Sequence, residues 1–542
     1  MKLDFRKQRF LLADAVAQRR KTLRNILYTL SAENISEVSS GAAALTQIQN
    51  HLYDFVLCSD DLGKGKNGQQ VLEEARLRGY LPLHTIFVMV SAEQSQDKVL
   101  GILENKPDDY LTYPFNAKQL AQRLERHFQR KQTCLTINQA IAAGDMRRAI
   151  KICEAKLNTS PPDIARYLKR LLAELALKTD DLGRAEALYR AFLKQRELDW
   201  VWLGLGKVAL QKKQFNQAEA CFHKALAIQP RLLECYDGLA ECQQARANLA
   251  GAQNMLATAL KLSPSVLARQ QKQAQIALAN NDLETAEQAA KMSLKLSEHS
   301  MHRQAGDFKT LAQIQQKQGL TEEALQSLQK LRRSFPKQHE AILSAALLEI
   351  ELFKTMDNTL LAEEAYQEAL REYGKLDPPI PGELAIDLAR RSMQEQNYAA
   401  AQAILEDVAK HYPDHSDLMS TVAQLPADFG QHQLGHDAIA RARRVLIEAN
   451  NEGVTLFKQQ RYREAETQLR RAFGRLPRNQ TLLVNLLKVM IHNLESLEYD
   501  ERKLANAFKY LDIARDLNVA TDVLNALNQR LQALEEQHHL SS

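Results

Sequence analysis

Oxygen-bearing side chains follow several short apolar runs in the first 130 residues of this 542-residue chain. Asp14 ends the first run, Ser59 and Asp60 end the third, and Ser91 follows the fourth. Carboxylates and hydroxyls can supply a nucleophile or hold a divalent ion, provided that the fold brings them together. Tyr113, just beyond the fifth run, adds a phenol. The chemistry open to this set therefore depends on the elements that position it.

Five apolar runs alternate with longer amphipathic stretches between residues 9 and 130. The runs are residues 10–13, 35–38, 55–58, 85–90 and 110–111. This rhythm predicts an α/β doubly wound fold, with a five-stranded parallel sheet covered by helices on both faces. The functional crevice of such an open sheet lies at the carboxyl ends of its strands, which is where the polar residues stand.

The strand ends resemble the receiver domain of bacterial response regulators, and the resemblance covers nearly all of residues 8–130. In that family two acidic residues after the first strand hold Mg²⁺, and an Asp at the end of the third strand accepts a phosphoryl group. The fourth strand ends in Ser or Thr, and a Lys precedes Pro-Phe after the fifth. The resemblance implies a flavodoxin-like receiver domain over residues 1–130.

This chain departs from the family pattern at three places. Asp14 keeps the first acidic position, but Ala15 replaces the second and offers no oxygen to an ion. Tyr113 replaces the Lys, so a fixed positive charge is missing. Ser59 replaces the phosphoacceptor when the third strand is aligned at the family's usual distance from Asp54. We therefore expect a pseudo-receiver that does not take up phosphate and needs no metal or cofactor.

A second alignment counts back from Gly68 and places Asp60 at the phosphoacceptor position. Adjacent strand residues point to opposite faces, so Ser59 and Asp60 cannot occupy the pocket in the same way. We favour Ser59. The alternative is a working response regulator in a phosphorelay, phosphorylated at Asp60 with Mg²⁺ bound, whose C-terminal region is the output.

Two further residues match the switch of the receiver family. Ser91 and Tyr110 match the hydroxyl and aromatic positions whose rotation signals activation there. Tyr110 either packs beside the fifth strand or keeps an interface role, because receivers commonly form homodimers or bind partners through this face. The bond between Tyr113 and Pro114 matches one that is usually cis.

Small and apolar residues recur at helical spacing through the rest of the chain. Trp202 and Gly206 share one helical face, Ala218 and Phe222 share the next, and a step of 34 residues from Ala218 reaches Ala252. This pattern resembles the tetratricopeptide repeat. It implies an all-α solenoid over residues 131–542, with capping helices at its C-terminal end and grooves that bind proteins or peptides.

Composition narrows the class of protein. The chain is 45% hydrophobic and 25% charged, and it contains no uncharged apolar run long enough to span a membrane. Its six cysteines form no CxxC pair, so we expect reduced thiols in a cytoplasmic protein. No phosphate-cradling glycine loop is present, and we expect no enzyme activity. A net charge of +5 makes nucleic acid an improbable partner.

The segment from Arg441 to Arg478 is an exception because its basic residues outnumber its acidic ones. It forms either a solvated helix face or a groove for an acidic ligand or nucleic acid, with Arg441, Arg443, Arg444 and Arg471 as contacts. Taken together, the sequence favours a non-catalytic signalling adaptor in a bacterial cytoplasm, in which a pseudo-receiver is joined to a partner-binding solenoid.

Overall fold

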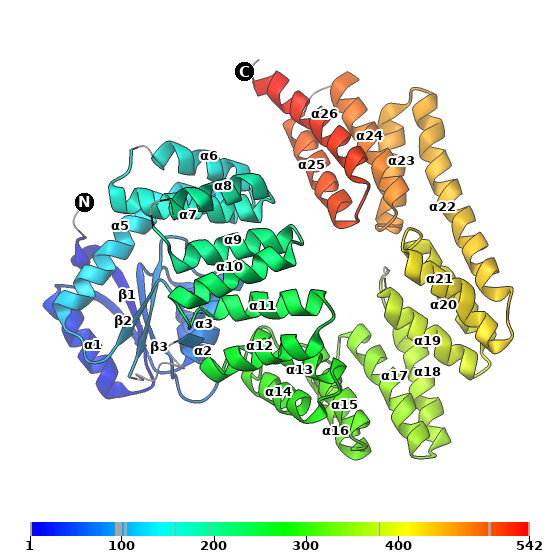
Figure 1. Cartoon of the computed structure of the whole chain (residues 1–542), viewed down its shortest axis with the longest axis horizontal. Coiled ribbons are helices and arrows are strands. Elements are labelled where there is room, and N and C mark those ends of the chain that lie inside the picture. Colours follow the sequence, from blue (N-terminus) through cyan, green and yellow to red (C-terminus); the bar gives the residue numbers. More distant parts are fainter. Residues whose placement is uncertain are drawn as a thin grey trace. The chain divides into compact units, whose positions relative to one another are not determined.

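The computed structural model describes residues 3–539 except 93–99, 102–103, 105, 158, 195, 379 and 497–499. The chain divides into two compact units, Met1–Ser327 and Leu328–Ser542 (Figure 1). The first unit contains an α/β domain followed by helices, and the described part of the second is helical throughout.

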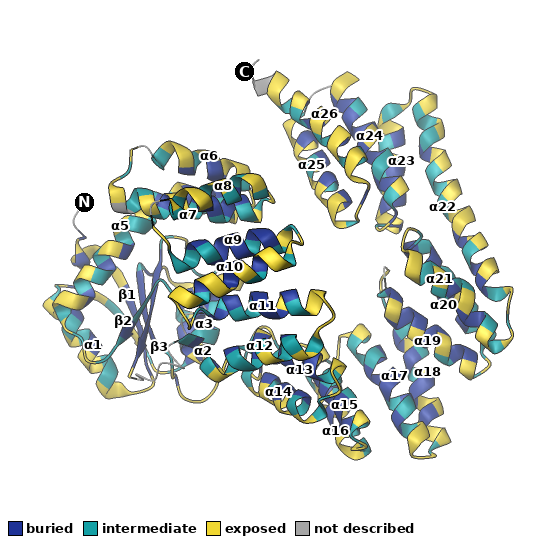
Figure 2. Ribbon diagram, viewed as in Figure 1, coloured by how far each residue is buried: buried dark blue, intermediate teal, exposed yellow. Residues whose placement is uncertain are grey.

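The α/β domain is built on a five-stranded parallel sheet in the order β2-β1-β3-β4-β5. Its strands are β1 Arg9–Ala13, β2 Asn34–Val38, β3 Phe55–Ser59, β4 Ile86–Ser91 and β5 Asp109–Thr112. Every residue of β3 and β4 is buried, which explains why these strands read as continuous apolar runs (Figure 2). The predicted fold class is confirmed.

Two layers of helices cover the sheet. α1 (Ala17–Thr29) and α5 (Ala117–Ala142) pack on one face, and α2 (Gly41–Asn50) and α3 (Gly68–Leu77) pack on the other. A capping box starts α3: Asn67 accepts from the Gln70 N–H at 2.9 Å, and the Gln70 side chain accepts from the Asn67 N–H at 3.1 Å. This cap fixes the loop that joins the end of β3 to α3.

Helix α5 continues past the domain boundary that we expect between residues 130 and 131. Leu120 and Leu124 pack in the core of the α/β domain, whereas Cys134 and Ile137 pack with the next two helices. Lys131 donates to Asp108 at 2.9 Å and so ties the middle of this helix to the start of β5. One helix therefore serves both regions.

Helices follow in the first unit, as predicted. They are α6 Met146–Leu157, α7 Pro162–Lys178, α8 Leu182–Leu193, α9 Asp199–Gln211, α10 Phe215–Ile228, α11 Leu233–Ala245, α12 Leu249–Leu262, α13 Leu267–Ala279, α14 Leu283–Leu296 and α15 Ala305–Lys317. The next helix, α16 Thr321–Ser334, crosses from the first unit into the second.

Helices α9, α10 and α11 pack closely because glycines face an aromatic ring. Phe222 of α10 is fully buried between Gly206 of α9 and Gly238 of α11. A Cβ at either glycine would lie 2.4 Å from this ring, so neither position has room for a side chain. The small residue at Gly206 therefore lets α10 approach α9 closely.

The second unit contains longer and less regular helices. They are α17 His339–Thr355, α18 Thr359–Tyr373, α19 Gly382–Gln394, α20 Tyr398–His411, α21 Ser416–Gln424, α22 Leu434–Lys458, α23 Tyr462–Arg475, α24 Gln480–Ser496, α25 Glu501–Asp516 and α26 Thr521–His539. A 3₁₀ turn, Leu425–Phe429, separates the short α21 from the 25-residue α22. No helix in the described residues is long and apolar enough to cross a bilayer.

Candidate functional site

The polar residues predicted at the strand ends meet at one edge of the sheet. Asp14 directly follows β1, Ser59 ends β3, Ser91 ends β4 and Tyr113 directly follows β5. The side chains of Asp14, Ser59 and Ser91 are about 1% exposed. We call this set, together with Ala15, the edge pocket.

Asp14 is the carboxylate of the edge pocket. Its Oδ1 accepts from the Val16 N–H at 2.7 Å, where the chain turns into α1. Burial raises the pKa of Asp14, while the Val16 N–H, the charges of Arg19 and Arg20 and the Ser59 hydroxyl oppose that rise. The neighbouring Ala15 is exposed and adds no oxygen.

Ser59 and Asp60 occupy different surroundings. Ser59 is buried, and its hydroxyl is close enough to Asp14 to lower the pKa of that carboxyl. Asp60 lies one residue beyond the strand, is partly exposed, and donates its backbone N–H to the Val90 carbonyl at 3.3 Å. Its side chain lines a neighbouring cavity together with Asp61.

Tyr113 closes the edge pocket on the β5 side. Its ring stacks on Phe115 with 5.0 Å between centroids. Burial and the negative charge of Asp14 raise the pKa of Tyr113, so the phenol is neutral at physiological pH. The bond between Tyr113 and Pro114 is cis, as the family resemblance implies.

Two arginines supply positive charge that the sequence reasoning missed. Arg20 donates to the Asp14 carbonyl at 2.6 Å and lies 3.6 Å from Glu37. The charge of Arg19 acts on both Asp14 and Tyr113. Both residues belong to the first turn of α1, and their place directly after the Asp14 turn is the signal that could have identified them.

Tyr110 of β5 is half-buried and packs against the core beneath α2 and α3. Its carbonyl accepts from Arg123 of α5 at 3.3 Å. The interface role of Tyr110 stays a prediction.

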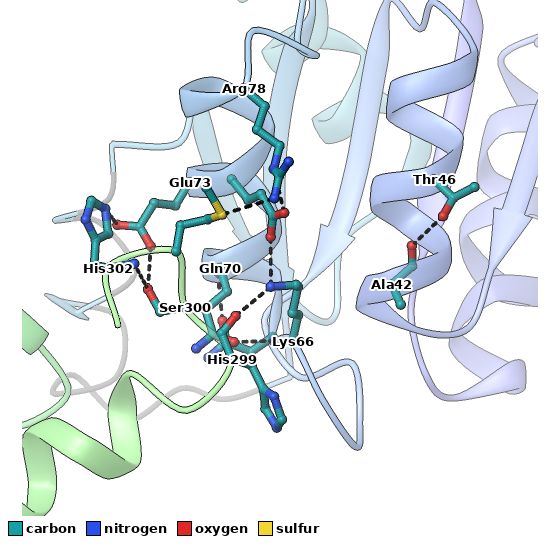
Figure 3. A network of polar contacts seen from close by, with 12 residues as sticks. Ala42, Thr46, Lys66, Gln70, Glu73, Arg78, His299, Ser300 and His302 are labelled. Carbon is teal, nitrogen blue, oxygen red and sulfur yellow. Dashed lines mark hydrogen bonds and ion pairs between the residues drawn. The ribbon is translucent and has the colours of Figure 1, made fainter. Parts of the chain in front are cut away.

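A second polar cluster joins α3 to the loop after α14 (Figure 3). Lys66 donates to the His299 carbonyl at 2.6 Å, and Gln70 donates to the Leu296 carbonyl at 3.1 Å. Glu73 lies 2.9 Å from His302. The last carbonyls of a helix lack intrahelical hydrogen-bond donors. Gln70 supplies such a donor to the last carbonyl of α14.

A third contact lies near the start of α13. Arg269, whose side chain is 3% exposed, contacts Glu104 and Asp237 at 2.7 Å each. The Ser263 hydroxyl is 3.4 Å from Glu104. The α/β domain is thus held on the helices by charged contacts between residues more than 150 positions apart.

The predicted basic contacts Arg441, Arg443 and Arg444 lie on α22, and Arg471 lies on α23; all four are exposed. Arg441 is 4.0 Å from Glu406, at the limit of an ion pair. This arrangement favours a solvated helix face.

The six cysteines are buried free thiols. No group of three potential metal ligands occurs among the described residues.

Comparisons with known proteins identify the family of the α/β domain. Residues 10–125 match the family described as response regulator receiver domain. The chemotaxis protein CheY of Pseudomonas aeruginosa is 26% identical over 122 residues, which cover 22% of this chain and 97% of that protein. CheY-3 of Vibrio cholerae is 25% identical over 122 residues, which cover 22% of this chain and 92% of that protein. Residues 10–125 therefore form a receiver domain.

Solved structures of other proteins also resemble parts of this chain. A structure reported for PilF of Pseudomonas aeruginosa is 16% identical, with a TM-score of 0.29, and the match covers 42% of this chain and 97% of that one.

Proposed function

We propose that this chain is a signalling adaptor whose receiver domain does not take up a phosphoryl group and whose helical region binds protein partners. A receiver domain joined to helical repeats supports a role in signalling and protein interaction. The six buried thiols fit a reducing cytoplasm. The finer assignment, that the receiver is inactive, rests on the edge pocket.

One observation carries this assignment: the edge pocket offers a single buried carboxylate and a neutral phenol. Mg²⁺ requires several oxygen ligands in octahedral geometry, whereas Asp14 has no acidic neighbour at Ala15 and one of its oxygens already accepts from Val16. A Mg²⁺ site does not fit this set of donors. Without the ion, negative charge gathering on a phosphoryl group would face only the charges of Arg19 and Arg20, which already act on Asp14.

Ser59 adds a second obstacle. A serine hydroxyl cannot form the acyl phosphate on which receiver signalling depends, and it needs a base to become a nucleophile. Asp14 is its acidic neighbour, but the positive charges of Arg19 and Arg20 act against the rise in the pKa of that carboxyl. We therefore assign the edge pocket a structural role and propose no catalytic residue and no cofactor.

The competing function is a receiver phosphorylated at Asp60. The observation in its favour is that Asp60 is partly exposed and reaches a cavity of about 770 Å³. Incubating the full chain with acetyl phosphate and Mg²⁺, followed by intact mass spectrometry, separates the two functions. We expect no added phosphoryl mass. A phosphoryl adduct that disappears in Asp60→Asn would establish the competing function.

A gain-of-function variant provides the matched control. A15D/S59D/Y113K restores the second carboxylate, the acceptor and the positive charge of the family. This variant should gain one phosphoryl group under the same conditions, whereas Y113K alone should not. A triple variant that stays unmodified would show that the Ser59 alignment is wrong.

A further inference from the structure

The helical region presents two subsites that each receive one carboxylate from the receiver domain. Each subsite combines one nitrogen-bearing side chain with one serine hydroxyl. Arg269 and Ser263 receive Glu104, and His302 and Ser300 receive Glu73. We call these four receiving residues the carboxylate surface.

The Arg269 subsite is the more buried of the two. Asp237 holds the guanidinium in place through Nε at 2.8 Å and Nη2 at 2.7 Å. The remaining donors point at Glu104, with distances of 2.7 and 3.4 Å. A planar guanidinium fixed on one side in this way is suited to bind a second carboxylate on the other.

The His302 subsite is more exposed and is ordered by its own loop. The Ser300 hydroxyl accepts from the His302 N–H at 3.0 Å and lies 3.4 Å from Glu73. His302 Nε2 lies 2.9 Å from the other oxygen of Glu73 (Figure 3). This loop therefore holds a hydroxyl and an imidazole around one carboxylate.

We propose that the carboxylate surface is a partner-binding site of the helical region, that it recognises an acidic segment, and that the receiver domain occupies it in cis. Its groups complement carboxylates at two points. The receiver is the resident ligand, and an acidic partner segment must displace it before binding. This inference rests on the proposed function, in which the helical region binds proteins. It adds the class of partner and the way in which the receiver blocks access to it.

The first test asks whether the two receiver carboxylates hold the domain in place. In E73K/E104K an ammonium replaces each carboxylate and cannot accept a hydrogen bond from either subsite, so the receiver should leave the surface. Hydrogen exchange of residues 296–303 should rise by about tenfold or more, because a contact that is mostly open protects its amides little. E33K/E125K, which makes the same charge change elsewhere on the receiver, should leave this segment protected. Unchanged exchange in E73K/E104K would overturn the proposal.

The second test asks what the surface binds once it is uncovered. The probe is a fluorescein-labelled hexaglutamate peptide, titrated by anisotropy against the full chain at low salt. E73K/E104K should bind it at least about tenfold more tightly than the wild type, because removing a competing occupant raises the competent fraction. Equal affinities in the two proteins would overturn the proposal.

The binding must also depend on the carboxylate surface itself. Adding H302Q and S300A to E73K/E104K removes the exposed subsite without touching the buried Arg269, so the fold should survive. The gain in peptide affinity should then be lost, whereas adding R443Q and R444Q should leave it intact. A gain that persists without His302 and Ser300 would overturn the proposal that both subsites bind the acidic segment. Neither readout involves phosphoryl transfer, so failure here is distinct from failure of the proposed inactive receiver.

Discussion

The edge pocket and the α3 contact lie on the same receiver domain and differ in how their polar groups are used. In the edge pocket, Asp14 keeps its carboxylate, but Ala15 and Tyr113 supply neither a second oxygen ligand nor a charge. At the start of α3, Gln70 and the preceding Lys66 each donate to a carbonyl of the helical region, as described above. The contacts that Lys66, Gln70, Glu73 and Glu104 make with the helices, including Arg269, form what we call the docking face. A receiver fold can thus keep its framework while its specific polar contacts lie at such a face.

The largest expected effect concerns Arg269, the most buried charge of the docking face. Arg269→Met leaves Asp237 and Glu104 facing each other without a cation, and breaking such a buried arrangement costs about 3 kcal/mol. Chemical denaturation of the full chain should show this loss in its first transition. Adding Glu104→Gln should recover part of it, because one of the uncompensated charges is then removed. A loss that is the same with and without Glu104→Gln would show that Arg269 is not coupled to the receiver.

The second-largest effect concerns the oxygen ligands that the edge pocket lacks for Mg²⁺. A15D/S59D places two new carboxylates beside Asp14, and the variant should gain stability when Mg²⁺ is added. At a Mg²⁺ concentration ten times the dissociation constant, the gain is about 1.4 kcal/mol. Thermal melts with and without Mg²⁺ measure it, with the wild type as the control that should not respond. A Mg²⁺ shift in the wild type would show that its pocket already holds the ion.

A smaller effect is expected from Asp14 itself. Because burial raises its pKa in the folded state, the stability contributed by protonated Asp14 is present at acid pH and is lost as the pH rises through that folded pKa. Asp14→Asn removes the ionisation and keeps an acceptor for the Val16 N–H. The variant should be more stable at neutral pH by about 1 kcal/mol or less, and the difference should shrink towards pH 4. An advantage that grows in acid would contradict the burial effect.

The strand ends of the receiver could be predicted because buried parallel strands have a simple signature. Five apolar runs placed Asp14, Ser59 and Ser91 at one edge, where the structure has them. The neighbouring charges of Arg19 and Arg20 could not be placed in the same way, because any amphipathic helix carries basic residues on its solvent side.

The contacts of the docking face could not be predicted from the sequence, for a different reason. Gln70 and Glu73 occupy ordinary polar positions of α3, and their partners lie 226 and 227 residues further along the chain. Contacts at such separations are set by how the helix pairs stack, which local periodicity does not determine. The amphipathic pattern of α5 likewise continues through residue 130, so it gave no sign that one helix serves two regions.

The smallest expected effect concerns the exposed edge of the docking face. Glu73→Gln removes the charge that faces His302, but both side chains are substantially exposed, at 30% and 50%. Pairs of this kind contribute well under 1 kcal/mol, so the unfolding midpoint should hardly move. The hydrogen exchange of residues 299–302 should still rise at low salt, and it should rise less at high salt because screening weakens the pair in the wild type as well. Glu33→Gln, an exposed substitution elsewhere on the receiver, should change neither. A loss of stability as large as that of Arg269→Met would contradict the difference in burial between the two subsites.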